Sequence, residues 1–402
     1  RRGDALLDGE RLLSPHFQHL PAPAALGSVQ SQPASLSSSM TSKPSIVVPS
    51  KVAVIGAGIA GACAAHALKN RGITVTVFDA DDGTAASANP TALIAPRLPR
   101  ERVPMGRMMA AAYLHAVPFY DDLAAAGADI WAGCRGTLTL ARNDDEAERQ
   151  QRALKAFNWP GNVMRTVTPA EAGDILGISV AHPGLWFSTA GTLKPPCVTA
   201  HLLRGIDITR TRIASPDALK VDYDAVILAA GTGVLDLMAP GTLPMRANRG
   251  QLTYIREMAD APGVAVTYGG YMTPAVTLPD GTAGHVLGAT YARHGEVPAA
   301  DWDRLRDEDH ATMLETLTAH LPRMDGATVI GGRTALRATV RDYLPIVGKL
   351  SDKVWALTGL GSRGFLTAPL MAEVLADQMT GAAGLLEADL IAAVAPGRFR
   401  ST

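Results

Sequence analysis

The segment Lys51–Asp79, KVAVIGAGIAGACAAHALKNRGITVTVFD, determines the fold of this chain. It begins with a short apolar run typical of a buried strand, and then turns at Gly56, Gly58 and Gly61. An Ala-rich helix and a second apolar strand follow, and the strand ends at the acidic residue Asp79. This order of strand, glycine turn, helix, strand and acid predicts a Rossmann-type dinucleotide-binding unit.

Each part of this unit has a predicted role. Gly56 permits the tight turn, Gly58 lets a pyrophosphate approach the backbone, and Gly61 lets the helix pack closely on the strand. The N–H groups at the start of the helix lie at the positive end of its dipole and are expected to bind the phosphates. Asp79 is placed to bind a ribose hydroxyl. The pattern alone does not distinguish NAD from FAD.

A second unit of this kind lies about 300 residues further along the chain. Val354–Thr358 is predicted to be a buried strand, GLGSRG (Gly359–Gly364) a glycine turn, and Phe365–Met379 a helix. The apolar run YDAVILAAG (Tyr223–Gly231) predicts a strand by which the chain returns to the cofactor sheet. Two glycine turns suit a cofactor that is contacted at both ends.

Composition narrows the class of protein. The 402 residues are enough for two or three folding units, and a formal net charge of −1 gives no general attraction to nucleic acid or anionic lipid. Cys63, Cys134 and Cys197 lack metal-ligand spacing, so no metal site is predicted and a reducing compartment is favoured. No apolar run predicts a membrane span and no signal peptide is recognisable, so a cytoplasmic location is expected. Because the first residue is Arg, we expect the chain to begin inside a longer product.

Several segments together resemble the D-amino-acid oxidase/glycine oxidase superfamily of FAD-dependent amine oxidoreductases. Within that superfamily the chain is similar to the FAD-dependent domain of a bifunctional tRNA-modifying protein, from about residue 51 to 399. The family's small Ser-Gly-Asn segment is replaced here by Ser87-Ala88-Asn89, with Ala92 in place of a glycine. The segments that carry the resemblance are RGQLT (Arg249–Thr253), GGYMTPA (Gly269–Ala275), GATY (Gly288–Tyr291), RDYLPIVG (Arg341–Gly348) and GLGSRGFLTAPL (Gly359–Leu370).

The expected fold is α/β, and α+β overall: a Rossmann-type FAD-binding domain with a second, largely antiparallel-sheet substrate domain. Residues 1–50, rich in Ser and Pro, are predicted to be a flexible tail or linker. The FAD-binding domain is expected at 51–135, at the return strand in 221–248 and at the closing part in 327–402. Residues 136–220 are expected to be mixed and mainly substrate domain, and 249–326 to be substrate domain.

The resemblance implies FAD as cofactor and an oxidation as the reaction. The substrate would be 5-carboxymethylaminomethyl-(2-thio)uridine at the wobble position of tRNA, which is an N-substituted glycine attached to a base. Hydride transfer to the flavin and hydrolysis of the imine would release glyoxylate and leave an aminomethyl group. The residues expected to bind FAD belong to the two glycine turns and the segments beside them: Gly56, Gly58, Ile59, Ala60, Gly61, Asp79, Ser87, Asn89, Gly231, Gly361, Ser362, Arg363 and Gly364.

Two residues are expected to contact the substrate. The resemblance places Arg337 where relatives bind a carboxylate, a group that a guanidinium can hold with two parallel hydrogen bonds. Tyr271 corresponds to an aromatic residue over the substrate. Arg337 as a surface strand residue and Tyr271 as a core residue are the alternatives. Ser362 is expected to cap the last helix, whose N-terminus would face the flavin, and Arg363 to pair with the cofactor or with tRNA phosphate.

The expected partner is tRNA, through local arginine clusters, since the net charge provides no general attraction. Arg97, Arg100, Arg102 and Arg107 form one such cluster, which could equally be a solvated face. A fused or separate methyltransferase is a further possible partner, and no membrane partner is expected. Two other functions are open: an FAD-dependent oxidase of a free small amino acid (glycine, sarcosine or a D-amino acid), and a non-catalytic flavin-binding partner of a methyltransferase.

Overall fold

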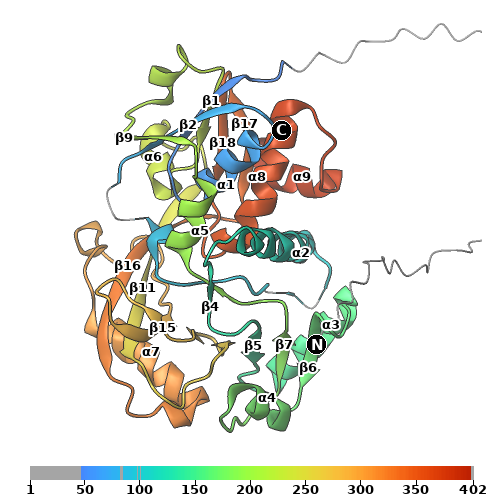
Figure 1. Cartoon of the computed structure of the whole chain (residues 1–402), viewed down its shortest axis with the longest axis vertical. Helices are drawn as coiled ribbons and strands as arrows, with labels where there is room; N and C mark the ends of the chain where they lie inside the picture. The colour runs from blue at the N-terminus through green and yellow to red at the C-terminus, as the bar shows by residue number, and fades with distance from the viewer. Residues whose placement is uncertain (1–46, 82–84, 97, 100, 400–402) are drawn as a thin grey trace, which may run out of the picture. The chain divides into compact units, whose positions relative to one another are not determined.

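The computed structural model describes residues 47–81, 85–96, 98, 99 and 101–399. The predicted tail of residues 1–50 lies almost wholly outside this range, as do Arg97 and Arg100 of the arginine cluster. Within the described residues, no helix combines the length and the apolar character needed to cross a membrane. The described chain contains two large sheets, one mainly parallel and one mainly antiparallel (Figure 1).

The mainly parallel sheet is the one that the glycine turns predicted. Its order is β17-β18-β10-β1-β2-β9, so strands from early and late in the chain share one sheet, with β10 between them (Figure 1). All pairs are parallel except β17–β18. We call it the cofactor sheet. Its strands are β1 (Lys51–Ile55), β2 (Thr74–Asp79), β9 (Asp207–Arg210), β10 (Ala225–Leu228), β17 (Ile346–Ser351) and β18 (Val354–Thr358).

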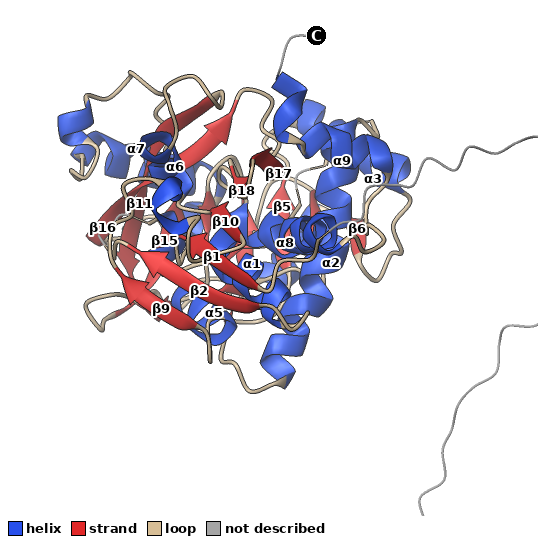
Figure 2. Cartoon of the chain, turned by 90° about the horizontal axis from the view of Figure 1, so that it is seen from above, coloured by secondary structure: helices blue, strands red, loops and turns tan. Residues whose placement is uncertain are grey.

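Helices cover one side of the cofactor sheet (Figure 2). Helix α1 (Ile59–Lys69) packs against α8 (Gly364–Thr380) and α5 (Pro195–Leu202), and α2 (Pro104–Ala125) packs against α8. Helix α1 is buried on nearly all sides, and its alanines allow the sheet and two helices to approach it closely. Helix α9 (Ala388–Val394) packs against α2. The short helix α6 (Val234–Leu237) belongs to the apolar cluster on the other side of the sheet.

The mainly antiparallel sheet has the order β16-β11-β15-β13-β12-β5-β7-β6, with β14 beside β15. We call it the substrate sheet. Its longest strands, β11 (Met245–Arg256) and β16 (Val329–Val340), pair along almost their full length. The others are β5 (Thr137–Leu140), β6 (Met164–Val167), β7 (Gly184–Phe187), β12 (Ala265–Thr267), β13 (Tyr271–Met272), β14 (Val276–Thr277) and β15 (Ala283–Gly288).

Helix α7 (Asp307–His320) packs on one face of the substrate sheet through Met313 and Leu317. The helices α3 (Asp144–Phe157) and α4 (Pro169–Leu176) pack near β6. A small third sheet is formed by β3 (Ala92–Leu93), β4 (Trp131–Ala132) and β8 (Thr192–Leu193). The predicted fold class, α/β with a second, largely antiparallel sheet, is confirmed.

Two strands lie in a different sheet from the one their predicted range suggested. Strand β16 pairs with β11 in the substrate sheet, although 327–402 was predicted to close the FAD-binding domain. Strand β9 extends the cofactor sheet beside β2, although 136–220 was predicted to be mainly substrate domain. Both differences arise because a strand's sheet depends on which distant strand it pairs with. A domain boundary predicted from the sequence gives no information about that pairing.

Candidate active site

The first glycine turn connects β1 to α1, and its geometry explains its glycines. Gly56 has a φ of +108°, and a Cβ there would lie 2.6 Å from the carbonyl oxygen of Ala229. A Cβ on Gly61 would lie 1.8 Å from the carbonyl oxygen of Gly56, so only glycine lets α1 start this close to the turn. A Cβ on Gly58 would meet only the side chain of Ser87, so this position leaves room for a ligand.

Asp79, at the end of β2, lies beside this turn. Its Oδ2 accepts a hydrogen bond from the N–H of Ala57 at 2.6 Å, and its Oδ1 accepts one from the N–H of Asp81 at 2.8 Å. A carboxylate can accept about four hydrogen bonds, so these two leave capacity for a hydroxyl donor. The predicted ribose contact therefore fits the position of Asp79 and stays a prediction.

Residues 85–89 run past the N-terminus of α1. Ser87 lies in the short 3₁₀ helix Ala86–Ala88, and its Oγ accepts a hydrogen bond from the N–H of Ile59 at 3.0 Å. Asn89 is held by Arg333 of β16, whose Nη1 donates to Asn89 Oδ1. Ser87 and Asn89 were both predicted to bind FAD, and they lie next to the helix terminus where phosphates are expected.

The second glycine turn lies against the first. A Cβ on Gly364, at the start of α8, would be 3.2 Å from Cγ2 of Ile59 at the start of α1, so the two helix N-termini are neighbours. Gly361, with a φ of +58°, donates its N–H to the carbonyl oxygen of Ala338 on β16 at 2.8 Å. Gly231, at the end of β10, accepts a hydrogen bond from Thr358 at 3.4 Å.

One local prediction at this turn is wrong. Ser362 was expected to cap the last helix, but the N-cap residue of α8 is Arg363, and no side chain caps the helix there. The reason is that the helix begins one residue later than a Ser362 cap requires, after the positive φ angles at Gly359 and Gly361. Arg363 instead donates from Nη1 to the carbonyl oxygen of Ala95 at 3.2 Å. Binding of the flavin by Ser362 and Arg363 stays a prediction.

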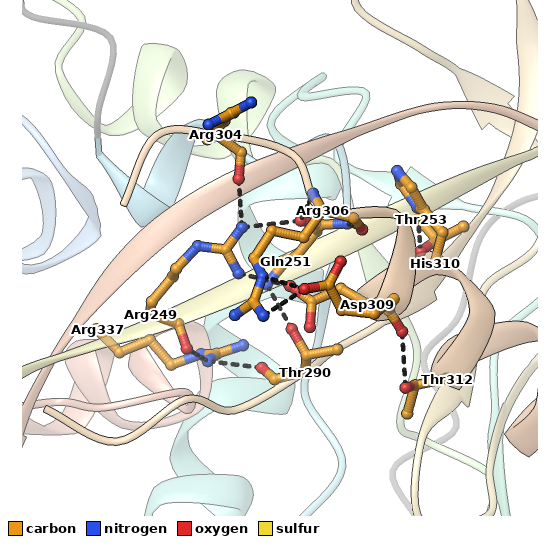
Figure 3. A network of polar contacts seen from close by, with 11 residues as sticks. Arg249, Gln251, Thr253, Thr290, Arg304, Arg306, Asp309, His310, Thr312 and Arg337 are labelled. Atoms are coloured by element: carbon orange, nitrogen blue, oxygen red, sulfur yellow. Dashed lines mark hydrogen bonds and ion pairs between the residues drawn. The ribbon is translucent and has the colours of Figure 1, made fainter. Parts of the chain in front are cut away.

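Arg337 lies on β16, opposite Asn248 of β11. Its guanidinium lies across Gly250, where a Cβ would be 2.1 Å from Nη1. Nη1 donates to the carbonyl oxygens of Arg249 at 3.3 Å and Thr290 at 3.1 Å (Figure 3). Among the described residues, Arg337 forms no ion pair, and its Nε and Nη2 have no hydrogen-bond acceptor. The guanidinium is therefore held in place with donors left for an anionic ligand.

Two tyrosines accompany this guanidinium. It lies 5.4 Å from the ring centre of Tyr291, and Tyr271 is close enough to interact with it electrostatically. Burial lowers the pKa of Arg337, and the two tyrosines act in the opposite direction. Burial also raises the pKa of Tyr271 to about 12, although the charge of Arg337 opposes this. Arginine stays charged at any physiological pH, and Tyr271 stays a neutral hydroxyl donor.

The residues behind Arg337 form a polar network that the sequence did not predict (Figure 3). Arg249, only 2% exposed, pairs with Asp309 at 2.6 Å and also donates to Gln251 Oε1 at 2.8 Å. These contacts attach the start of α7 to β11. In the sequence, the RGQLT segment served only as a marker of the resemblance. Nothing in the sequence indicated that Arg249 of this segment pairs with the distant Asp309.

Arg333 was also missed, although a signal for it existed. It lies four residues before Arg337 on β16, and residues four apart in a strand share a face. Arg333 and Arg337 therefore lie on one face of the substrate sheet, and Arg333 reaches the segment that carries Asn89.

The remaining predicted features lie apart from this site. Arg102 is exposed, and Arg107 is paired with Asp389 at 2.6 Å and with Glu387. A cavity of about 630 Å³ is lined by residues such as Cys134 and Met258, none of which was predicted to bind ligand. This cavity contains neither a glycine turn nor Arg337.

The comparisons with known proteins agree with this geometry. Residues 51–378 match the family model described as FAD dependent oxidoreductase (DAO). The chain therefore belongs to the family of FAD-dependent oxidoreductases, and FAD is its cofactor. The residues present fit that group: two adjacent helix N-termini, the glycine turns and the carboxylate of Asp79.

Within this family, the chain is similar to tRNA 5-methylaminomethyl-2-thiouridine biosynthesis bifunctional proteins, named MnmC. It is 34% identical to that of Magnetococcus marinus over an alignment 398 positions long, which covers 87% of this chain and 59% of the relative. It is also 34% identical to that of Thiobacillus denitrificans over 384 residues, covering 87% and 60%. The chain thus spans about three-fifths of the length of these relatives.

Solved structures show the same fold. Glycine oxidase from Geobacillus kaustophilus superimposes with a TM-score of 0.70 at 18% identity, over 88% of this chain and 99% of that one. L-proline dehydrogenase from P. horikoshii also gives 0.70 at 18% identity, over 87% and 97%. These likenesses confirm the predicted fold.

Proposed function

We propose that this FAD-dependent oxidoreductase removes the carboxymethyl group of 5-carboxymethylaminomethyl-(2-thio)uridine at the tRNA wobble position. The products would be glyoxylate and 5-aminomethyl-(2-thio)uridine. The observation that carries the proposal is Arg337, a half-buried guanidinium without an acidic partner among the described residues. It lies on the strand that contacts the second glycine turn and residues 85–89. The similarity to the MnmC proteins supports the base as the carrier of the glycine-like group.

Bound FAD supplies the acceptor for a hydride from the methylene carbon between the amine and the carboxylate. Arg337 would bind that carboxylate through two parallel hydrogen bonds and so fix the methylene in place. Tyr271, neutral with a pKa of about 12, would donate a hydrogen bond to the substrate. Loss of the hydride from carbon and of a proton from the amine nitrogen to solvent would leave an imine. One water would then add to the imine carbon, and breaking the carbon–nitrogen bond would release glyoxylate while the amine stays on the base.

The decisive experiment uses the FAD-loaded protein and tRNA that carries the carboxymethylaminomethyl group. Nucleoside mass spectrometry should show that the carboxymethyl group has been exchanged for hydrogen, and a trapping reagent should recover one glyoxylate per base. An unchanged nucleoside with stoichiometric FAD would contradict the proposal. Heat-treated protein and tRNA without the modification are the matched controls.

The two other functions give different results in the same assay. A free-amino-acid oxidase would reduce its flavin with glycine, sarcosine or a D-amino acid and leave the tRNA unchanged. A non-catalytic flavin-binding partner would show no flavin bleaching with any of these under anaerobic conditions.

The tRNA partner is also a proposal. If arginines such as Arg102 contact phosphates, the logarithm of the tRNA binding constant should fall linearly with the logarithm of salt concentration. Arg107 is a weaker candidate than the sequence suggested, because its charge is already paired with Asp389 and Glu387. A cytoplasmic location and a methyltransferase partner likewise stay predictions.

A further inference from the structure

Strand β16 is connected to the second glycine turn and to residues 85–89, the segment beside the first glycine turn. In the first half of the strand, Arg333 donates from Nη1 to Asn89 Oδ1 and from Nη2 to the carbonyl oxygen of Ala85 at 2.8 Å. Near the end of the strand, the carbonyl oxygen of Ala338 accepts the N–H of Gly361 at 2.8 Å. A strand of the substrate sheet is therefore attached to the segments that hold both ends of the cofactor site.

The Arg333 connection continues to the start of α1. Asn89 and Ala85 flank the short 3₁₀ helix that contains Ser87. Ser87 Oγ in turn accepts the N–H of Ile59, one of the first N–H groups of α1. These are the groups that an α-helix leaves without partners inside the helix, and they are the ones that bind phosphate. Arg333 thus sets the position of the segment lying over the phosphate end of the turn.

The shape of arginine suits this connection. A guanidinium is a planar fork whose two Nη atoms can donate in fixed directions, so it can hold a side-chain amide and a main-chain carbonyl at once. Burial lowers the pKa of Arg333, but the group stays charged at physiological pH. A lysine carries its three N–H donors on a single nitrogen, so it cannot donate from two separate atoms in the fixed directions of the guanidinium fork.

We propose that Arg333 is a positioning residue for the cofactor: it holds residues 85–89 against the N-terminus of α1, so that FAD meets a preformed site. Because Arg333 and Arg337 share one face of β16, the same strand orders the cofactor side and carries the predicted carboxylate-binding cation. This inference rests on FAD binding, which the family shows, and is independent of the proposed tRNA substrate.

The test is the affinity of the apoprotein for FAD, measured by quenching of flavin fluorescence, so no substrate is needed. Arg333→Met should raise the Kd for FAD about tenfold or more. Asn89→Ala should have a similar effect. The double variant, Arg333→Met with Asn89→Ala, should bind FAD no more weakly than Arg333→Met alone. Both substitutions break the same Arg333–Asn89 contact, so their effects should not add. Arg323→Met is the control, since Arg323 pairs with Asp260 on the exposed surface and should leave the Kd unchanged.

Two further measurements separate positioning from general destabilisation. The melting temperature of the apoprotein should be nearly unchanged in Arg333→Met, while the rise in melting temperature on adding FAD should be smaller than in the unsubstituted protein. Arg333→Lys should restore FAD binding only in part. If Arg333→Met does not fold, Arg333→Lys takes its place in the comparison with the double variant. A Kd within twofold of the original for Arg333→Met, or independent losses that multiply in the double variant, would overturn the proposal.

Discussion

Arg337 shows how a residue can be predicted from a motif while its surroundings cannot. The resemblance identified the residue, and the position of its guanidinium agrees with a carboxylate-binding role. That position depends on Gly250 of the neighbouring strand, which leaves space for the guanidinium. It also depends on the carbonyl oxygens of Arg249 and Thr290, which are far from Arg337 in the sequence. Partners of this kind are set by strand register, which one sequence does not reveal.

Replacing Arg337 with Met should raise KM for the modified tRNA about 100-fold, corresponding to roughly 2.7 kcal/mol for the loss of a buried charge-assisted contact. FAD content should stay normal, because the hydrogen bonds of Arg337 go to Arg249 and Thr290 and not to the glycine turns. Steady-state kinetics and the ratio of flavin to protein absorbance measure the two effects. Loss of flavin with an unchanged KM would instead assign Arg337 to the cofactor site. Arg323→Met serves as the control for removal of an arginine elsewhere.

Replacing Gly250 with Ala tests the placement of the same guanidinium from the opposite strand. The new Cβ would collide with the flexible end of the Arg337 side chain, which can move aside, so the melting temperature should change little. The displaced guanidinium should bind the carboxylate less well and raise KM at least about tenfold. Gly161→Ala, where the added Cβ meets nothing within 4 Å, is the matched control. An unchanged KM in Gly250→Ala would contradict the prediction, because it would show that substrate binding does not depend on this position of the Arg337 guanidinium.

At the scale of elements, the strand–turn–helix unit that binds the cofactor could be predicted because its sequence pattern is local. The turn after β1 and the helix α1 follow one another within a few residues, and glycine positions alone specify the close approach. The pairing of strand β16 with β11 was not evident from the predicted range 327–402, because β11 lies far away in the sequence. The contact of Arg333 with Asn89 was unpredictable for the same reason, since 244 residues separate the two.

Replacing Gly61 with Ala should affect the whole cofactor unit. The added Cβ would lie 1.8 Å from the main-chain oxygen of Gly56, and because that neighbour is backbone, α1 or the turn must move. We expect protein that is purified with little FAD and melts at a lower temperature, as absorbance and thermal unfolding would show. Gly161→Ala should change neither. Stoichiometric FAD in Gly61→Ala would contradict the packing described for this turn.

At the scale of the molecule, buried histidines make stability depend on pH. Burial lowers the pKa of His66, His115 and His285 below the usual value of 6.5, and it is the largest cause at each ring. The folded protein therefore binds fewer protons at these sites than the unfolded chain does. Stability that is present above pH 6.5 is lost as the pH falls below it, by up to about 1.4 kcal/mol per pH unit for each histidine.

Chemical unfolding measured between about pH 8 and pH 5 should show this loss at the acidic end. His115 offers the cleanest variant, because its buried Nε2 has no hydrogen-bond partner among the described residues. His115→Leu should flatten the pH dependence in this range without changing FAD binding. Carboxylates with a lowered pKa, such as Asp342, change the stability only at more acidic pH. They therefore do not affect the comparison of His115→Leu with the original protein in this range. A His115→Leu profile that matches the original would exclude this histidine as a contributor.

The proposed function depends on one reaction: FAD-dependent removal of a carboxymethyl group from a tRNA base. The most direct measurement mixes the FAD-loaded protein anaerobically with tRNA carrying 5-carboxymethylaminomethyl-(2-thio)uridine, and follows flavin absorbance and nucleoside mass together. We predict bleaching of the flavin, conversion to the aminomethyl nucleoside and one glyoxylate per flavin reduced. A flavin that stays oxidised with this tRNA but is bleached by glycine or sarcosine would contradict the account.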